Sequence, residues 1–296
     1  MTSTTEQESL TQPQLTVEGT PVIAAAPVTT IIARRPLSLP LRGLWEFREL
    51  LYFLTWRDIK VRYKQTAIGA AWAIIQPLVT MVIFTAVFHR VARIDTGSVP
   101  YPVFAFAGLL PWNLFAGALQ RSIQSLVSSA PLITKVYFPR LVVPVAATFA
   151  ATVDFLIAFG VLIVMAVWYG IGLTWRIALV PAVVGMALLT ALAVGLWLSA
   201  INVKYRDVGH AIPFVIQAWM FASPVAYPTG LVPERWQLLY GLNPMVGVIQ
   251  LFRWALLGGQ APDTGTLAVS GGVTVLLLLG GLLFFHRMER TFADTI

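Results

Sequence analysis

Long apolar stretches recur along this chain, and they constrain its fold more than any other feature. Five of them reach the length of about 20 mostly apolar residues that an α-helix needs to cross a bilayer. They are Ile68–Phe88, Pro100–Gln120, Leu141–Tyr169, Ile177–Ile201 and Thr266–Phe285, and the third is long enough to tilt or bend. A shorter stretch, Ala211–Tyr227, adds a sixth. We therefore expect an all-α membrane protein with six transmembrane helices.

Composition agrees with this fold class and excludes some kinds of site. Of the 296 residues, 57% are hydrophobic and 11% are charged, whereas a soluble domain has about 25% charged residues. The chain has no cysteine, so it can form neither a disulfide nor a thiolate metal site. Its three histidines, His89, His210 and His286, lie far apart. The sequence therefore predicts no metal site.

The distribution of basic residues predicts an orientation. The net charge of +7 is compatible with nucleic-acid binding, but in a membrane protein it fits the excess of Lys and Arg in cytoplasmic segments. With both termini in the cytoplasm, only five of the 20 basic residues fall outside, namely Arg90, Arg93, Arg176, Arg235 and Arg253. The remaining fifteen, with all the lysines, fall inside. We expect both termini to be cytoplasmic and no nucleic-acid partner.

The segment before the first span divides into two parts. Residues 1–40 are rich in Thr, Pro, Gln and Ser, which predicts a disordered cytoplasmic tail. Residues 41–64 contain an amphipathic pattern, in which Leu44, Phe47, Leu51 and Leu54 recur at helical spacing. This pattern predicts a helix in the membrane interface, and a cytoplasmic helix packed on protein is the alternative. A basic run follows, and it suits anionic headgroups or plain anchoring: Arg57, Lys60, Arg62 and Lys64.

Two other segments are too apolar to be solvated loops. The loop after the second span mixes basic and large apolar residues, which favours contact with a soluble partner, with packing on the bundle as the alternative. It contains Pro131, Leu132, Ile133, Thr134, Lys135, Val136, Tyr137, Phe138, Pro139 and Arg140. Pro228–Asp263 is apolar but interrupted by Gly241, Asn243-Pro244 and Gly258-Gly259. We expect two short re-entrant helices there, buried by protein or lining a wet cavity.

A single carboxylate, Asp154, falls within a span. A carboxylate inside a membrane is costly and indicates function by default, and a structural hydrogen bond or ion pair is the alternative. The lysines precede Val61, Gln65, Val136 and Tyr205, so the chain has no Gly-Lys-Ser/Thr phosphate loop. We expect a non-catalytic chain without a cofactor of its own.

Six motifs in order resemble the permease subunits of ABC-2-type polysaccharide exporters, which serve O-antigen, capsule and teichoic acid export. The resemblance covers roughly residues 43–290. The motifs are WRDIKVRYKQTAIGAAWAIIQP (Trp56–Pro77), FAGLLPWNLF (Phe106–Phe115), PLITKVYFPR (Pro131–Arg140), NVKYRDVGH (Asn202–His210), SPVAYP (Ser223–Pro228) and LNPM (Leu242–Met245).

The resemblance implies a homodimer in the bacterial inner membrane, with residues 65–296 as the transmembrane domain. A separate pair of ATPase subunits would bind ATP and Mg²⁺, and Pro131–Arg140 would be the helix that couples them to the membrane. Residues 41–64 would be the gate helix, and the re-entrant elements would lie near Trp236–Tyr240 and Met245–Leu256. The substrate would be a lipid-linked glycan.

Two groups of residues are candidates for substrate contact in such an exporter. The basic run Arg57–Lys64 could bind the diphosphate of the lipid carrier through charge-assisted hydrogen bonds. Aromatic rings could line the channel, although each could equally belong to the aromatic belt that faces lipid. These rings are Trp112, Phe115, Trp219, Phe221, Tyr240 and Trp254.

Two other functional classes remain open at this point. An ion-coupled secondary transporter would need paired intramembrane ionisable groups or an inverted repeat, and the spans contain one carboxylate and no visible repeat. A membrane-embedded glycan-processing enzyme would need an acidic or histidine cluster, and none is visible in the sequence.

Overall fold

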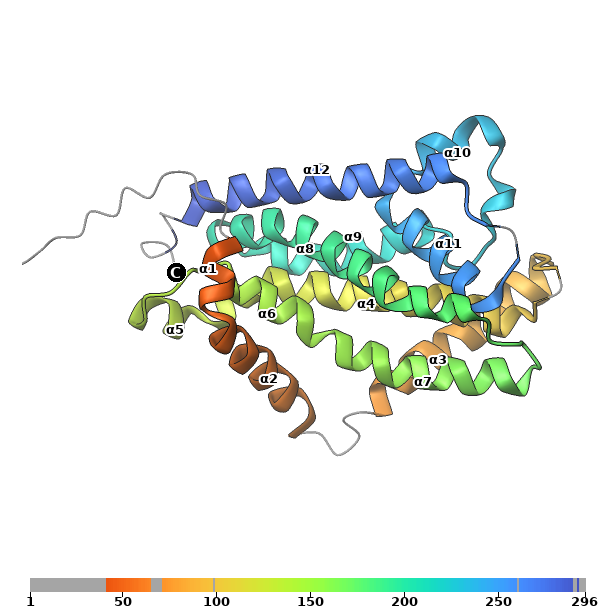
Figure 1. The fold of residues 1–296 in the computed structure, drawn as a ribbon, viewed down its shortest axis with the longest axis horizontal. Coiled ribbons are helices and arrows are strands. Elements are labelled where there is room, and N and C mark those ends of the chain that lie inside the picture. The colour runs from red at the N-terminus through yellow and green to blue at the C-terminus, as the bar shows by residue number, and fades with distance from the viewer. Residues whose placement is uncertain (1–40, 65–70, 98, 260, 290–291, 293–296) are drawn as a thin grey trace, which may run out of the picture. The chain divides into compact units, whose positions relative to one another are not determined.

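The structure, a computed structural model, describes residues 41–64, 71–97, 99–259, 261–289 and 292. Within these ranges every regular element is helical (Figure 1). Residues 1–40, for which the sequence predicts a disordered tail, lie outside the described residues. The elements are α1 (Leu41–Glu46), α2 (Arg48–Lys64), α3 (Trp72–Phe84), the π-helix η2 (Thr85–Val91), α4 (Tyr101–Ser128), α5 (Ala130–Lys135), α6 (Val142–Ala150), α7 (Thr152–Trp168), η3 (Trp175–Leu179), α8 (Val180–Lys204), α9 (Asp207–Phe221), η4 (Thr229–Leu231), α10 (Glu234–Tyr240), α11 (Pro244–Leu257) and α12 (Thr264–Met288).

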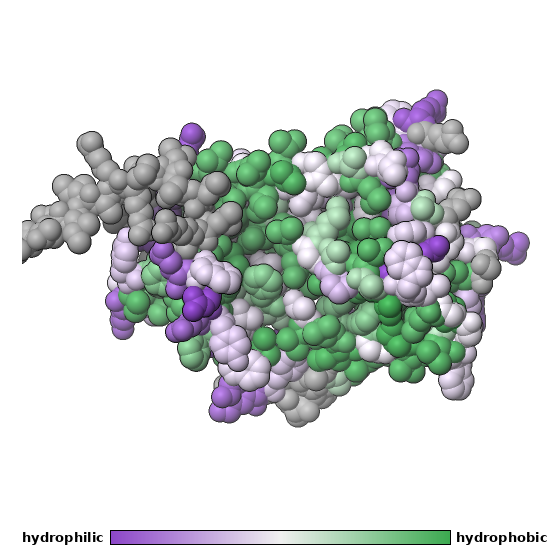
Figure 2. Space-filling view, viewed as in Figure 1, coloured by the Kyte–Doolittle hydropathy of each residue, from purple (hydrophilic) through white to green (hydrophobic). Residues whose placement is uncertain are grey.

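Five helical segments of the described chain are long and apolar enough to cross a membrane. They are Trp72–Val91, Tyr101–Ser128, Val142–Trp168, Trp175–Lys204 and Thr264–Met288. These correspond to the five long stretches of the sequence, so that part of the prediction is confirmed. The third segment is interrupted at Ala151, between α6 and α7. In Figure 2, apolar residues cover the middle of the visible face and hydrophilic residues gather toward its two ends.

The predicted sixth span corresponds to α9. This helix has 15 residues and ends at Phe221, six residues before the predicted end at Tyr227. Four turn residues, 222–225, follow it and include Pro224, and proline removes a backbone donor that a continuing helix would need. Because 15 residues are fewer than the roughly 20 that cross a bilayer, the count of six stays a prediction.

Helix α4 is the central element of the described bundle. It contacts α3, α6, α7, α8, α9 and α11, and most of its length is buried. Small residues allow its close approach to α8, as they do between membrane helices generally. A Cβ on Gly195 of α8 would lie 2.9 Å from the Cβ of Ser122 on α4. The bundle is therefore organised around α4, and the side chains of α4 line the spaces between it and the neighbouring helices.

Helix α2 packs on the bundle through the predicted apolar face. Leu54 is buried, and Leu44, Phe47 and Leu51 pack on the same cluster, which includes Val142 of α6. The helix contacts α6 and continues to Lys64. Its other face exposes three aromatic rings, Tyr52, Phe53 and Trp56. The structure thus shows packing on protein, and the position of the exposed face in the membrane interface stays a prediction.

Two short helices occupy the region between α9 and α12, as the sequence predicts. The Asn243 side chain caps α11 by accepting a hydrogen bond of 3.1 Å from the backbone N–H of Met245. Asp263 caps α12 in the same way, through a hydrogen bond of 2.7 Å from the backbone N–H of Thr266. That hydrogen bond lowers the pKa of the Asp263 carboxyl. In Figure 1, α10 lies at the end of the bundle opposite to α5.

Candidate functional site

A cluster of charged side chains surrounds Asp154, in the first turn of α7. Its carboxylate accepts hydrogen bonds from the Tyr63 hydroxyl and from the Arg121 guanidinium. The Arg62 Nη1 atom lies 3.1 Å from Asp154 Oδ2. Arg62 and Tyr63 come from α2, whereas Arg121 comes from α4. Three helices that are distant in sequence therefore meet at one carboxylate.

This arrangement satisfies the carboxylate inside the bundle. The side chains of Asp154 and Arg121 are each 22% exposed, so water screens their interaction only in part. A charge in such a position is stable only when it is paired and hydrogen-bonded. Asp154 thus forms the ion pairs that the sequence left as the alternative to a functional carboxylate, and these pairs join α2 to α4 and α7.

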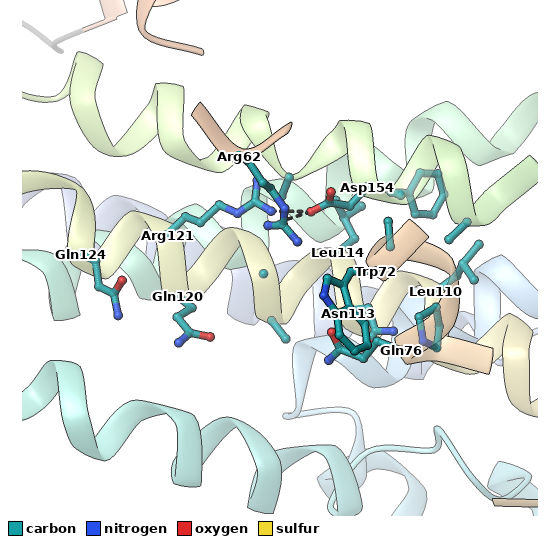
Figure 3. A pocket seen from close by; sticks show the side chains of 17 residues that line it. Arg62, Trp72, Gln76, Leu110, Asn113, Leu114, Gln120, Arg121, Gln124 and Asp154 are labelled. Carbon is teal, nitrogen blue, oxygen red and sulfur yellow. Dashed lines mark hydrogen bonds and ion pairs between the residues drawn. The ribbon is translucent and has the colours of Figure 1, made fainter. Parts of the chain in front are cut away.

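A cavity of about 340 Å³ opens beside this cluster, between α3, α4 and α7. Figure 3 shows Arg62 and Arg121 turned toward Asp154, and the amide side chains along α4 away from it. Aliphatic groups of Pro77, Leu110 and Leu114 complete part of the wall, and the Trp72 ring lies at one side. Ionic groups therefore line one part of the cavity and neutral groups line the rest.

Four amide side chains contribute to this cavity: Gln76 of α3, and Asn113, Gln120 and Gln124 of α4. The three on α4 are separated by seven and four residues, so they form one stripe along the helix. None of the four amides forms a hydrogen bond with the described part of the chain. A polar stripe without internal partners therefore runs along the central membrane helix.

The predicted coupling segment has an inner and an outer side. Ile133 and Phe138 are each 6% exposed and pack in the cluster that also contains Leu54. In contrast, Val136 is half exposed and Tyr137 is 90% exposed. The backbone N–H of Arg140 donates a hydrogen bond of 3.3 Å to Glu289. The segment therefore packs on the bundle through its inner side, and contact of its exposed apolar side with a soluble partner stays a prediction.

All four members of the basic run on α2 are exposed, and two of them form ion pairs. Arg57 forms an ion pair of 2.9 Å with Asp58, and Arg62 pairs with Asp154. The side chains of Lys60 and Lys64 are exposed. All four cations are therefore accessible, the two arginines within ion pairs, and recognition of a diphosphate stays a prediction.

The six aromatic candidates do not share one environment. Trp112 and Phe115 are buried in the core of the chain, where both rings contact Trp219. Their rings therefore face other side chains in this structure and not an open space. Tyr240 hydrogen-bonds to the Tyr227 hydroxyl at 2.8 Å. The remaining two are Phe221, which is half exposed, and Trp254, which lies under Arg176. Lining of a channel by these rings stays a prediction.

A buried cation lies at the other end of α4. Arg253 of α11 donates hydrogen bonds to the carbonyls of Phe104 (3.2 Å), Pro224 (2.6 Å) and Val225 (2.6 Å). Its guanidinium lies 3.6 Å from the centre of the Phe104 ring. The predicted topology places Arg253 in an outer segment. The structure shows that its side chain is buried inside the bundle. It holds α11 against α4 and the turn after α9.

Several motifs of the sequence meet around this cation. Gly108 lies so close that a Cβ there would be 2.7 Å from the Val225 carbonyl oxygen. The Asn243 side chain donates a hydrogen bond of 2.8 Å to Ser223 and accepts one of 3.0 Å from Trp219. The motifs FAGLLPWNLF, SPVAYP and LNPM are therefore parts of one packed junction.

Sequence reasoning did not identify Tyr63, Arg121 or the four cavity amides as site residues. The partners of Asp154 lie 91 and 33 residues away in the chain, so no local pattern joins them. The amide stripe did leave a signal, because Asn113, Gln120 and Gln124 share one face of a long apolar helix. Polar side chains at helical spacing inside a span are the pattern that finds such a stripe.

These features define a multi-pass helical membrane protein with a polar cavity inside its bundle. Residues 49–257 match the family described as ABC-2 type transporter. Because this match covers most of the sequence, the chain belongs to the ABC-2 type transporter family.

Characterised relatives are similar over nearly their full length. The O-antigen export system permease protein RfbA of Myxococcus xanthus is 31% identical over 257 residues, which cover 86% of this chain and 98% of that protein. A protein of the same name from Klebsiella pneumoniae is 27% identical, over 84% of this chain and 95% of its own length. The polysialic acid transport protein KpsM of Escherichia coli is 23% identical, over 79% and 91%.

Proposed function

We propose that this chain is the permease subunit of an ATP-driven exporter that moves a lipid-linked polysaccharide across the bacterial inner membrane. One observation carries the proposal: similarity to an O-antigen export permease extends over 98% of that protein's length. The family match over residues 49–257 and the five apolar segments support it. The chain would form the path, and nucleotide hydrolysis would occur in a separate subunit.

The proposed topology has six spans, with both termini in the cytoplasm. Helix α9 would be the fifth span, together with the turn residues that follow it, and α10 and α11 would be re-entrant. Helix α11 supports this because it is apolar, has only 14 residues, and is buried against α4, α8 and α12. Basic residues in the last turns of α8 and α12, Lys204 and Arg287, support a cytoplasmic location for that end.

The ATPase would dock on the outer side of α5 and the residues after it. Tyr137 is 90% exposed beside the half-exposed Val136, and a solvated loop has no need of such an apolar surface. Helix α5 follows α4 after a single residue, Ser129. A displacement of α5 on ATP binding would therefore act directly on the central helix of the bundle, which also carries the cavity.

A second copy of the chain would complete the path. Helix α9 leaves an apolar face uncovered, with Phe214 78% exposed and Val215 half exposed. A homodimer, as the resemblance of the motifs implies, would cover such a face. The carrier diphosphate would bind near the exposed Lys60 and Lys64, because two neighbouring cations can donate charge-assisted hydrogen bonds to phosphate oxygens.

The test is reconstitution of the purified protein in liposomes, with and without the ATPase that co-purifies from the native membrane. ATP should drive accumulation of lipid-linked glycan on the far side only when both subunits are present. Transport driven by a proton gradient without the ATPase would contradict the proposal. So would chemical conversion of the lipid-linked sugar by the chain alone.

A further inference from the structure

The four cavity amides are polar groups without a hydrogen-bond partner in the described chain, and all four line one cavity. Gln76, Gln120 and Gln124 are exposed in the single chain, and Asn113 is half-buried. Each belongs to a helix that is long and apolar enough to cross a membrane. An amide without a hydrogen-bond partner in hydrocarbon costs several kcal/mol. These side chains therefore face water or a polar ligand and not lipid tails.

The chemistry of the lining favours a neutral ligand. The charges near the cavity, Arg62 and Arg121, are both within an ion pair of Asp154, so a bound anion would compete with that carboxylate. An amide offers two donors and an acceptor, and a hydroxyl group likewise both donates and accepts. The indole of Trp72 is half exposed beside the cavity, and it adds an aromatic face. Amides beside an indole match a ligand that has many hydroxyls and an apolar face.

The spacing of the amides agrees with a segment of a chain. The cavity volume of about 340 Å³ is enough for a small part of such a chain at one time, since ligand sites range over about 300–1,000 Å³. Asn113 and Gln124 are eleven residues apart, which at 1.5 Å per residue separates them by about 16 Å along α4. Several amides in a row can exchange hydrogen bonds with successive sugar residues.

We propose that this cavity is a subsite for neutral sugar residues, whose hydroxyls are bound by Gln76, Asn113, Gln120 and Gln124. The inference deepens the proposed function and rests on it, because it names the part of the glycan that this surface recognises. Binding is weak at each amide and is repeated along α4, so a glycan can move past without dissociating completely.

The absence of cysteine from the natural chain allows a direct test on the full chain in its complex with the ATPase. Single variants Gln120→Cys and Gln124→Cys are reacted with a water-soluble maleimide, with and without maltoheptaose as a neutral hexose oligomer. Ala92→Cys, an exposed position outside the cavity, is the control. Inorganic pyrophosphate replaces the sugar in a parallel series.

We expect both cavity cysteines to react with the reagent and maltoheptaose to slow the reaction about five-fold at about four times its Kd. The control should react equally fast with and without the sugar. Lack of reaction at both cavity positions, equal slowing of the control, or protection by pyrophosphate and not by the sugar would each overturn the inference. If only the inference fails, the wild-type complex still transports glycan with ATP. If the proposed function fails, the wild-type complex does not transport glycan with ATP.

Discussion

The Nη2 atom of Arg253 donates a hydrogen bond of 2.6 Å to the carbonyl oxygen of Val225, although the two residues lie 28 positions apart. The same guanidinium reaches the carbonyls of Pro224 and Phe104, so one side chain joins α11, α4 and the turn after α9. At membrane depth, backbone carbonyls that have no partner within a helix need such donors. Arg253 therefore stabilises the turn after α9, together with Asn243 and Tyr101, which donate hydrogen bonds to the carbonyls of Ala222 and Ala226.

The first prediction concerns this cation. Arg253→Met removes the donors of three carbonyls, and each unsatisfied buried carbonyl costs about 1–3 kcal/mol. We expect a loss of at least about 3 kcal/mol in the free energy of unfolding, measured as a lower midpoint of thermal unfolding in detergent. Arg253→Lys keeps the charge but loses the planar fork, so its midpoint should fall between those of the methionine variant and the wild type. An unchanged midpoint for the methionine variant would contradict this role.

The second prediction concerns the ion pairs of Asp154. Asp154→Asn leaves Arg62 and Arg121 without a carboxylate in a partly buried place. We expect a loss of about 1–3 kcal/mol in the free energy of unfolding, between the values for exposed and buried pairs. Asp58→Asn, which breaks only the exposed pair with Arg57, should cost less than about 1 kcal/mol.

A second substitution tests whether Asp154 acts through its pairs. In Asp154→Asn with Arg121→Met, one of the two cations that lose their carboxylate is absent and Arg62 remains. The double variant should therefore be more stable than the sum of the two single changes. Thermal unfolding of the four proteins gives the coupling energy. A coupling energy near zero would show that the pair does not hold α4 to α7.

The sequence predicts the long membrane helices well because length and hydropathy are local properties. The spans around Val82, Phe104, Leu156, Leu189 and Leu276 all appear as helical segments. The helix of the second continues to Ser128, eight residues beyond the predicted end at Gln120. The break after α9 was less predictable, since mostly apolar residues continue from Phe221 to Tyr227 and the turn between them is stabilised by contacts with Arg253 of α11. Tertiary contacts therefore determine where this segment stops being helical.

Site residues were harder to predict for the same physical reason. Trp112 is as amphipathic as any ring that faces a channel, and only packing against Trp219 places it in the core. Within the coupling segment, Tyr137 and Phe138 are adjacent and chemically alike, yet one is exposed and the other buried. Adjacent residues on a non-helical segment can point in opposite directions, and hydrophobicity alone does not distinguish them.

This difference yields the third prediction. Tyr137→Asp should leave thermal unfolding of the permease unchanged, because the ring is 90% exposed, and should prevent co-purification of the ATPase. Tyr137→Phe, which keeps the apolar ring, should retain the ATPase. Phe138→Asp buries a carboxylate in an apolar cluster and should lower the amount of folded protein in the membrane. Retention of the ATPase by the Tyr137→Asp variant would exclude docking at this surface.

The fourth prediction concerns transport through the amide stripe. Replacement of Asn113 and Gln120 together by Leu removes two groups that bind hydroxyls and adds apolar surface that a hydrated sugar chain does not contact well. ATP-driven glycan transport in liposomes should fall by about ten-fold or more, which corresponds to about 1.4 kcal/mol in the barrier, or about 0.7 kcal/mol for each amide.

The matched control is Gln217→Leu, an exposed amide of α9 outside the cavity. It should keep transport within about two-fold of the wild-type rate. ATPase association should be normal in both proteins, because neither change touches the surface at Tyr137. Equal losses of transport in the control and in the double variant would show that any added leucine impairs the bundle. A loss confined to the double variant assigns the effect to the amide stripe of the cavity, because Gln120 and Gln217 are both exposed glutamines that leucine replaces.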